Sequence, residues 1–139
     1  MTTNPRCRQY LDGLHAYASE AGLQPSEPKG TNNSLRFPAI GEASHIGVAV
    51  TSDRLRVNLN NDQDEDRAIL KALLADSAAL DLATGETLDW EDIDPTRKKS
   101  VVRASHPGGY MSEAADWTAQ YAWAVGVVKI FEREYRARF

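Results

Sequence analysis

The stretch that decides the fold is residues 117–139, WTAQYAWAVGVVKIFEREYRARF. Its large apolar side chains recur every three or four residues, which is the spacing of one face of an α-helix. That face consists of Trp117, Tyr121, Ala124, Val125, Val128, Phe131 and Tyr135, widened by Trp123, Val127 and Ile130. A stripe so broad predicts a long, nearly surrounded helix. Such a helix lies across a sheet and against the first helix, or it keeps one apolar side for a partner.

Two extended segments are predicted ahead of this helix, at residues 88–93 and 100–105. Residues 94–96 contain a proline and separate the two segments. Residues 106–109, His-Pro-Gly-Gly, are typical of a turn, because glycine and proline favour the backbone angles that turns need. Ser112 then has the side chain of a helix N-cap.

The middle of the chain predicts a three-stranded antiparallel meander, with strands at residues 35–40, 45–51 and 55–59. In the third strand apolar and polar residues alternate, which is the pattern of a strand with one face in the core and one in water. Ser52 and Asp53 form the tight turn before it. Pro38 cannot donate a backbone hydrogen bond, so the first strand is expected at an edge of the sheet.

Two further helices are predicted from caps and periodicity. The first begins at Asn4 as N-cap with Pro5 at its first position, and it ends at Gly22. Its apolar stripe consists of Cys7, Tyr10, Leu11, Leu14, Tyr17, Ala18 and Ala21. The second follows the acidic run 60–66, whose carboxylates suit the positive end of a helix dipole, and it carries Ile69, Leu70, Leu73 and Leu74 before it fades near Gly85.

The elements together predict a single α+β domain over residues 1–139: a helix, a three-stranded meander, a helix, one or two further strands, and a long C-terminal helix packed on the sheet. The chain has 26% charged and 42% hydrophobic residues, which is ordinary for a soluble globular protein. No apolar run reaches the length of a membrane span, and no signal-peptide pattern is present, so we expect a cytoplasmic protein without a membrane partner. The lone Cys7 is expected in the core.

Motifs of catalysis and of metal binding are not evident. Asp62, Asp64 and Asp66 have the spacing that opens a calcium loop, but the glycine and glutamate that such a loop needs are replaced by Arg67 and Leu73. The acidic-x-Lys pair of a restriction-type nuclease occurs only at 27–29, in a proline-rich loop. The histidines are scattered, and neither a nucleophile elbow nor a phosphate-binding glycine loop is present. We therefore expect no metal and no cofactor, and an enzyme only if its site has no sequence motif.

The basic residues offer one functional option. Arg54 and Arg56 lie on the polar side of the third strand, while Arg97, Lys98, Lys99 and Arg103 lie in or before a later strand. In one sheet they would form a basic face that contacts a nucleic-acid backbone without reading sequence. The alternative is a face balanced by nearby carboxylates. The net charge of −4 disfavours nucleic acid as the partner.

A second basic cluster lies near the end of the last helix, where cations are favourable without any ligand. It contains Lys129, Arg133, Arg136 and Arg138. The exposed side of this helix, with Lys129, Arg133 and Arg136, is the predicted partner-binding surface. The partner is another protein, or the same chain in a homodimer.

Five stretches carry a resemblance to a known family: residues 37–41, 45–50, 54–59 and 85–91, and the helix from residue 117 to residue 139. In this order they resemble a bacterial domain of unknown function, the DUF4268 family. Domains of that family occur alone or at the end of larger proteins, some with restriction-like or other DNA-processing parts. The resemblance thus implies an accessory role in DNA processing or defence, and it supplies no catalytic residue. We expect a non-enzymatic interaction module, with weak nucleic-acid binding or a motif-free enzyme as alternatives.

Overall fold

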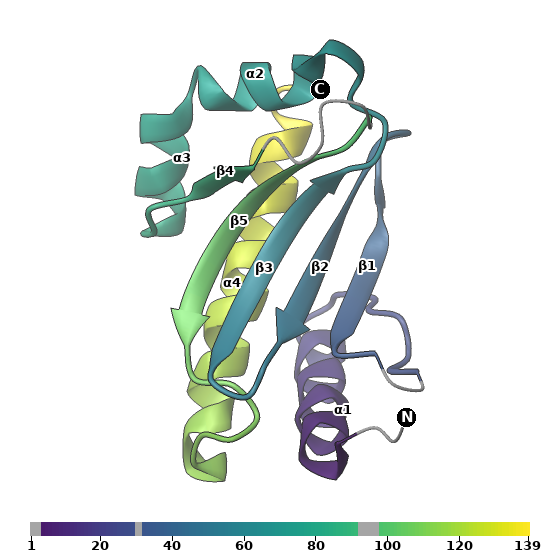
Figure 1. Cartoon of the computed structure of the whole chain (residues 1–139), viewed down its shortest axis with the longest axis vertical. Helices are drawn as coiled ribbons and strands as arrows, with labels where there is room; N and C mark the ends of the chain where they lie inside the picture. Colours follow the sequence, from purple (N-terminus) through teal and green to yellow (C-terminus); the bar gives the residue numbers. More distant parts are fainter. Residues whose placement is uncertain (1–3, 30–31, 92–97) are drawn as a thin grey trace.

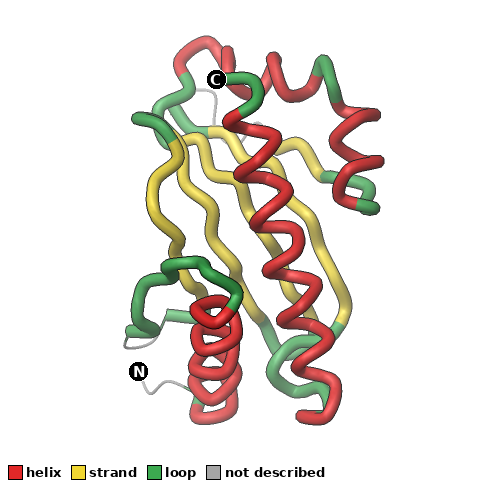
Figure 2. Tube along the Cα trace, turned by 180° about the vertical axis from the view of Figure 1, so that it is seen from behind, coloured by secondary structure: helices red, strands yellow, loops and turns green. Residues whose placement is uncertain are grey.

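The computed structural model describes residues 4–29, 32–91 and 98–139. It is a two-layer α+β structure in which a five-stranded antiparallel sheet has helices on one face (Figures 1 and 2). The strands lie in the order β1-β2-β3-β5-β4. In chain order the elements are α1 Pro5–Glu20, β1 Ser34–Ile40, β2 Ser44–Val50, β3 Arg54–Asn61, α2 Ala68–Leu74, α3 Ser77–Thr84, β4 Asp89–Glu91, β5 Ser100–Pro107 and α4 Trp117–Arg136, with short 3-10 turns Glu65–Arg67 and Ala114–Asp116. The predicted fold class is confirmed.

The first three strands form the predicted meander. Ser52 and Asp53 make the turn between β2 and β3, and the amide of Thr51 donates to the carbonyl of Arg54 across it. β1 lies at the edge of the sheet, as Pro38 predicted, and its pairing with β2 is irregular between Arg36 and Ala39. A proline is tolerated there because an edge strand has one row of backbone donors without a ladder partner.

Helices α4 and α1 cover the inner face of the sheet and complete the core (Figure 2). The apolar stripe predicted for the last helix is buried, so α4 lies across the sheet and against α1. The Tyr10 ring of α1 meets the rings of Trp117 and Tyr121 of α4 edge to face, with centroids 5.0 Å apart in both pairs. Such edge contacts are favourable for aromatic rings, and they fix how the two helices pack.

Helix α1 begins and ends as expected. The Asn4 side chain accepts a hydrogen bond from the amide of Arg6 at 2.9 Å, and Pro5 is the first helical residue. Gly22, with a φ of +90°, follows the helix end in the left-handed conformation that glycine adopts without strain. Cys7 is buried in the core, as predicted.

The single helix predicted after the acidic run is wrong: the structure has two helices, α2 and α3, which break at Ala75 and Asp76. The Asp76 side chain is bound outside the helix, since its carboxylate accepts from Arg138 at 2.9 Å. Aspartate and serine favour helix starts over helix interiors, so the Asp76-Ser77 pair suits a new helix better than a continued one. Leu74, which was expected on the apolar face, is 46% exposed.

Two other local predictions, the cap of the last helix and the strand before β5, differ from the structure. Ser112 does not cap α4, because the 3-10 turn intervenes, and its hydroxyl instead donates to the carbonyl of Gly109 at 2.6 Å. β4 covers only Asp89–Glu91 of the strand predicted at 88–93. Leu88 precedes the strand, while residues 92–93 and the predicted turn at 94–96 lie outside the residues that the structure describes. No helix within the described ranges has the length and apolarity that crossing a bilayer requires.

Candidate functional site

The face of the sheet opposite the helices is uncovered by any described helix, and we call it the open face (Figure 1). Its outward side chains are aligned in rows by the strand register. One row runs from Arg36 through Gly47 and Asn58 to Arg103. The next runs from Ser34 through Ala49 and Arg56 to Ser105. The residues in these two rows are polar or small, whereas Val101 of β5, opposite Asn60 on the same face, is apolar and buried.

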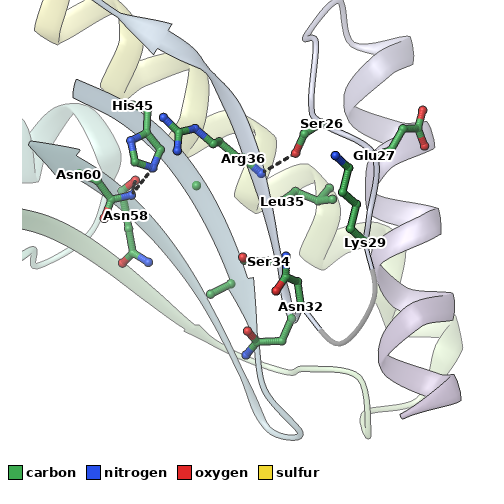
Figure 3. A pocket seen from close by; sticks show the side chains of 13 residues that line it. Ser26, Glu27, Lys29, Asn32, Ser34, Leu35, Arg36, His45, Asn58 and Asn60 are labelled. Atoms are coloured by element: carbon green, nitrogen blue, oxygen red, sulfur yellow. Dashed lines mark hydrogen bonds between the residues drawn. The ribbon is translucent and has the colours of Figure 1, made fainter. Parts of the chain in front are cut away.

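A hollow of about 550 Å³ lies on the open face above the two smallest of these residues, Gly47 and Ala49 of β2. We call this hollow the trough. Figure 3 shows its walls, which come from β1, β3 and the loop before β1. They include Lys29, Asn32, Arg36, His45, Asn58 and Asn60. A trough forms because β2 has no large outward side chain at two successive positions, while both neighbouring strands do.

His45 lies at one end of the trough and is held from both sides. Its Nδ1 lies 2.6 Å from Oδ2 of Asp62, and its Nε2 lies 3.4 Å from the amide nitrogen of Asn60. Its side chain is only 14% exposed. The ring is thus fixed in orientation by a carboxylate, and it closes the trough at the end where β3 leads into the acidic run.

Three cations beside the trough have no carboxylate partner within the described part of the chain: Lys29, Arg36 and Arg56. Arg56 is half-buried, and its Nε is a buried donor without a hydrogen bond. A buried donor without a partner is uncommon in folded proteins and calls for a physical reason. The protein itself covers this atom, so a ligand on the open face does not reach it in this conformation.

The six residues predicted for nucleic-acid binding are only partly brought together. Arg54, Arg56 and Arg103 lie on the open face, and Nε of Arg103 donates to Oδ1 of Asn58 at 2.7 Å. Lys99 is exposed before β5, and Arg97 lies outside the described residues.

Lys98, the remaining predicted residue, is engaged in an ion pair. Its Nζ lies 2.6 Å from Oε1 of Glu65. This hydrogen-bonded pair lowers the pKa of the Glu65 carboxyl and raises the pKa of Lys98. Both side chains are exposed to solvent, so the pair holds the two segments together only weakly. Its carboxylate partner nevertheless makes Lys98 a poorer phosphate ligand than a free lysine.

The predicted partner-binding residues lie on the outer side of α4, as expected. Lys129, Arg133 and Arg136 are all exposed. Arg136 pairs with Glu132 at 3.1 Å and Arg133 with Glu134 at 3.6 Å, both within the same helix. Their role in binding a partner stays a prediction, and the apolar stripe that would support it is already covered by the sheet and α1.

Nucleophiles and metal ligands do not gather in the described ranges. Burial raises the pKa of the Cys7 thiol, which disfavours the reactive thiolate. Burial also raises the pKa of Tyr10, whose hydroxyl donates to Gln120 inside the core. Among the residues described, no three His, Cys, Asp or Glu side chains are placed to hold a metal ion.

Sequence reasoning missed most of the trough. Arg36 and Lys29 were not among the predicted site residues, and neither were Gly47 and Ala49. The signal was present in β2, where His45, Gly47 and Ala49 alternate with buried residues, so that two small residues fall on the outer face. Two small residues at consecutive outward positions of a strand indicate a hollow only when the register is known, because the register places larger side chains on both sides.

Fold and site together define a two-layer α+β protein with one open, polar sheet face. No family model matches the chain, and no curated protein matches it. A solved structure that is similar to it is the crystal structure of YbjN, "a putative transcription regulator from E. coli". The two chains are 15% identical, the similarity covers 91% of this chain and 93% of YbjN, and the TM-score is 0.46.

Proposed function

We propose that the chain is a non-enzymatic binding module that takes a protein partner on the open face of its sheet. The observation that carries the proposal is the asymmetry of the sheet: α1 and α4 cover one face, while the other face has a hollow of about 550 Å³ instead of a flat solvated surface. Clefts of several hundred Å³ with a few convergent polar groups are typical of binding sites.

A protein partner suits this face better than a nucleic acid. The described outward positions of the sheet include no Phe, Tyr or Trp on which a base could stack, and stacking supplies much of the affinity of single-strand binders. The chain carries 20 acidic and 16 basic residues, the reverse of a typical nucleic-acid-binding domain. The biological setting that we propose, an accessory role in a bacterial DNA-processing or defence system, is supported only by the family resemblance.

The test compares the wild-type chain with Ala49→Gln, which fills the trough with a neutral side chain. Ala49 is the better position, because a Cβ at Gly47 would already lie 3.4 Å from the carbonyl oxygen of Leu35. Both proteins are used for affinity capture from nuclease-treated lysate, and each captured protein is purified and titrated against both. We expect at least one purified partner to bind the wild type, and its affinity for Ala49→Gln to be at least about tenfold weaker. Equal binding of every purified candidate to both proteins contradicts the proposal.

Weak nucleic-acid binding is the second candidate, because Arg54, Arg56 and Arg103 do share the open face. It predicts affinity for duplex DNA that falls by about 0.9 log unit per log unit of salt for each phosphate neutralised. Fluorescence anisotropy with a labelled duplex over a range of salt concentrations measures this slope. A slope near zero, or no binding at low salt, rejects this candidate and leaves the protein-binding proposal in place.

A further inference from the structure

We infer that the trough binds an extended acidic segment of a partner protein, with Arg36 and Arg56 as its carboxylate anchors. The inference rests on the proposed function and adds the chemistry of the partner. It follows from four features of the described residues: the shape of the trough floor, the arginines without a carboxylate partner on its two sides, the nearby carboxylates that do not pair with them, and the amide side chains of the wall.

The shape of the trough fits an extended chain. Its floor follows β2 between His45 and Ala49, four residues apart, which corresponds to about 13 Å of strand. Gly47 and Ala49 leave room above this floor, and β1 and β3 on either side lie about 10 Å apart. A single extended segment of about four residues therefore fits along the floor, between the side chains of the two outer strands.

Two arginines without a carboxylate partner among the described residues lie on the two sides of this floor. Among the other described cations, Arg8 pairs with Asp12, Arg136 with Glu132, and Arg138 with Asp76, whereas Arg54, Lys71, Lys99 and Lys129 have no carboxylate partner within the described ranges. In a chain with an excess of acidic residues, Arg36 on β1 and Arg56 on β3 still form no ion pair within the described ranges. Lys29 adds a third unpaired cation at the trough wall.

The described carboxylates close to the trough do not pair with Arg36 or Arg56. Asp62 holds Nδ1 of His45 at 2.6 Å, and Glu27 lies 3.4 Å from Nε2 of His15. The guanidinium groups beside the floor are therefore left for a ligand. Guanidinium binds carboxylate through paired hydrogen bonds.

Amide side chains supply the other half of the recognition. Asn32 and Asn60 line the trough beside the cations (Figure 3). An extended peptide presents a backbone donor and a backbone acceptor at every residue, and an amide side chain can pair with both. The Asn32 side chain forms no hydrogen bond within the described ranges, whereas the side-chain nitrogen of Asn60 already lies 3.4 Å from Nε2 of His45 and keeps its oxygen for a ligand. In this arrangement arginine binds the acidic side chains and asparagine binds the peptide backbone. The combination favours an acidic peptide over a nucleic acid, because a nucleic acid has no peptide groups.

The test uses three fluorescein-labelled decapeptides, in which threonine alternates with glutamate, glutamine or lysine, and measures their binding by fluorescence anisotropy. The protein variants are Arg36→Ala, Arg56→Ala and Ala49→Gln, with Arg8→Ala as the matched control, since Arg8 is an exposed arginine on α1. Circular dichroism verifies that each variant is folded. Because Arg56 is half-buried, the exposed Arg36 keeps the test decisive if Arg56→Ala unfolds.

The wild type is expected to bind the glutamate peptide about tenfold more tightly than the glutamine peptide, and the lysine peptide least of all. Arg36→Ala should lose about tenfold in affinity for the glutamate peptide only, Ala49→Gln should weaken both acidic and neutral peptides, and Arg8→Ala should bind as the wild type does. Equal affinity for glutamate and glutamine peptides, no binding of any peptide, or an equal loss in Arg8→Ala overturns the inference. Displacement of the glutamate peptide by a tighter-binding oligothymidine overturns it as well.

Failure of this inference can be told apart from failure of the proposed function. The partner purified by affinity capture is titrated against Ala49→Gln and Arg36→Ala in parallel. Loss of binding in Ala49→Gln alone means that the open face binds a partner that is not acidic, so only the inference fails. Unchanged binding in both variants means that the open face is not the binding surface, and both fail.

Discussion

At the residue scale, Gln120 is the polar side chain that ties the last helix to the rest of the protein. It is 5% exposed. Its Oε1 accepts from the Tyr10 hydroxyl at 2.7 Å and from the Gly109 amide at 3.1 Å, and its Nε2 donates to Ser112 at 2.8 Å. One amide therefore connects α4, α1 and the turn before α4. The sequence pattern of α4 showed only its apolar stripe and not this buried polar group.

Gln120→Ala should lower the free energy of unfolding by about 2–4 kcal/mol, because it leaves the Tyr10 hydroxyl and the Gly109 amide buried without a partner. Chemical denaturation measures the loss. Thr118→Ala, an exposed position on the same helix, is the control and should change stability by less than about 0.5 kcal/mol. A loss in Gln120→Ala no greater than that of the control contradicts a structural role for the network.

Tyr121 makes stability depend on alkaline pH. Burial raises the pKa of Tyr121 to about 12, and its hydroxyl donates to the carbonyl of Tyr10 at 2.9 Å. In the unfolded chain the pKa is about 10, so the folded state keeps the proton longer. The stability that this neutral hydroxyl contributes is complete below pH of about 10 and is lost as the pH rises toward about 12, by about 2–3 kcal/mol.

Denaturation curves between mildly and strongly alkaline pH measure this loss, with phenolate absorbance as a direct readout. Tyr121→Phe cannot ionise at this position and should show a shallower decline, although Tyr10, whose pKa is also raised, still contributes. If every tyrosine of the folded protein ionises near the ordinary pKa of tyrosine, the expected protection of Tyr121 is wrong.

At the element scale, the connection from β3 to α2 shows how the acidic run is used. Asp64 is 1% exposed, and its carboxylate accepts from the amides of Ile69 and Leu70 and from the Ser100 hydroxyl. The sequence predicted acidic residues at the start of this helix for electrostatic reasons. It did not predict that one of them is buried and links the helix to β5, because Ser100 is far away in the chain.

The same connection contains two residues in the left-handed conformation, Asp66 and Arg67, both with a φ of +58°. Non-glycine residues adopt this conformation at a cost of about 1 kcal/mol. Asp66→Gly should therefore stabilise the protein by about 0.5–1 kcal/mol, measured by thermal and chemical denaturation. Asp66→Ala keeps the strain and should bring no gain. Equal stability of the glycine and alanine variants would argue against strain at this position.

At the scale of the whole molecule, the broad stripe of α4 determines whether copies of the chain associate. A homodimer was one expectation from the sequence, since an apolar side of the last helix could remain free. The structure buries that stripe against the sheet and α1, and it leaves Lys129 and Arg133 on the outer side. We now expect a monomer of 15.4 kDa at low and at high salt.

Light scattering coupled to size exclusion measures this mass directly. The double variant Arg133→Glu, Arg136→Glu is the informative companion, and it should have the same mass and a similar melting temperature, because both side chains are exposed. A salt-resistant dimer in the wild type that dissociates in the double variant would instead locate the partner surface on α4 and count against the open face.

The sequence by itself determined the order of the elements apart from the break between α2 and α3, the meander, the edge position of β1 and the buried stripe of the last helix. These follow from local rules: a period of two or of about 3.6 residues, a cap, and a proline without a backbone donor. Only the tertiary structure decided which side of the sheet is covered and which cations remain unpaired. The trough needs the register of three strands and the placement of a distant loop, and local rules do not specify contacts between residues that are far apart in the chain.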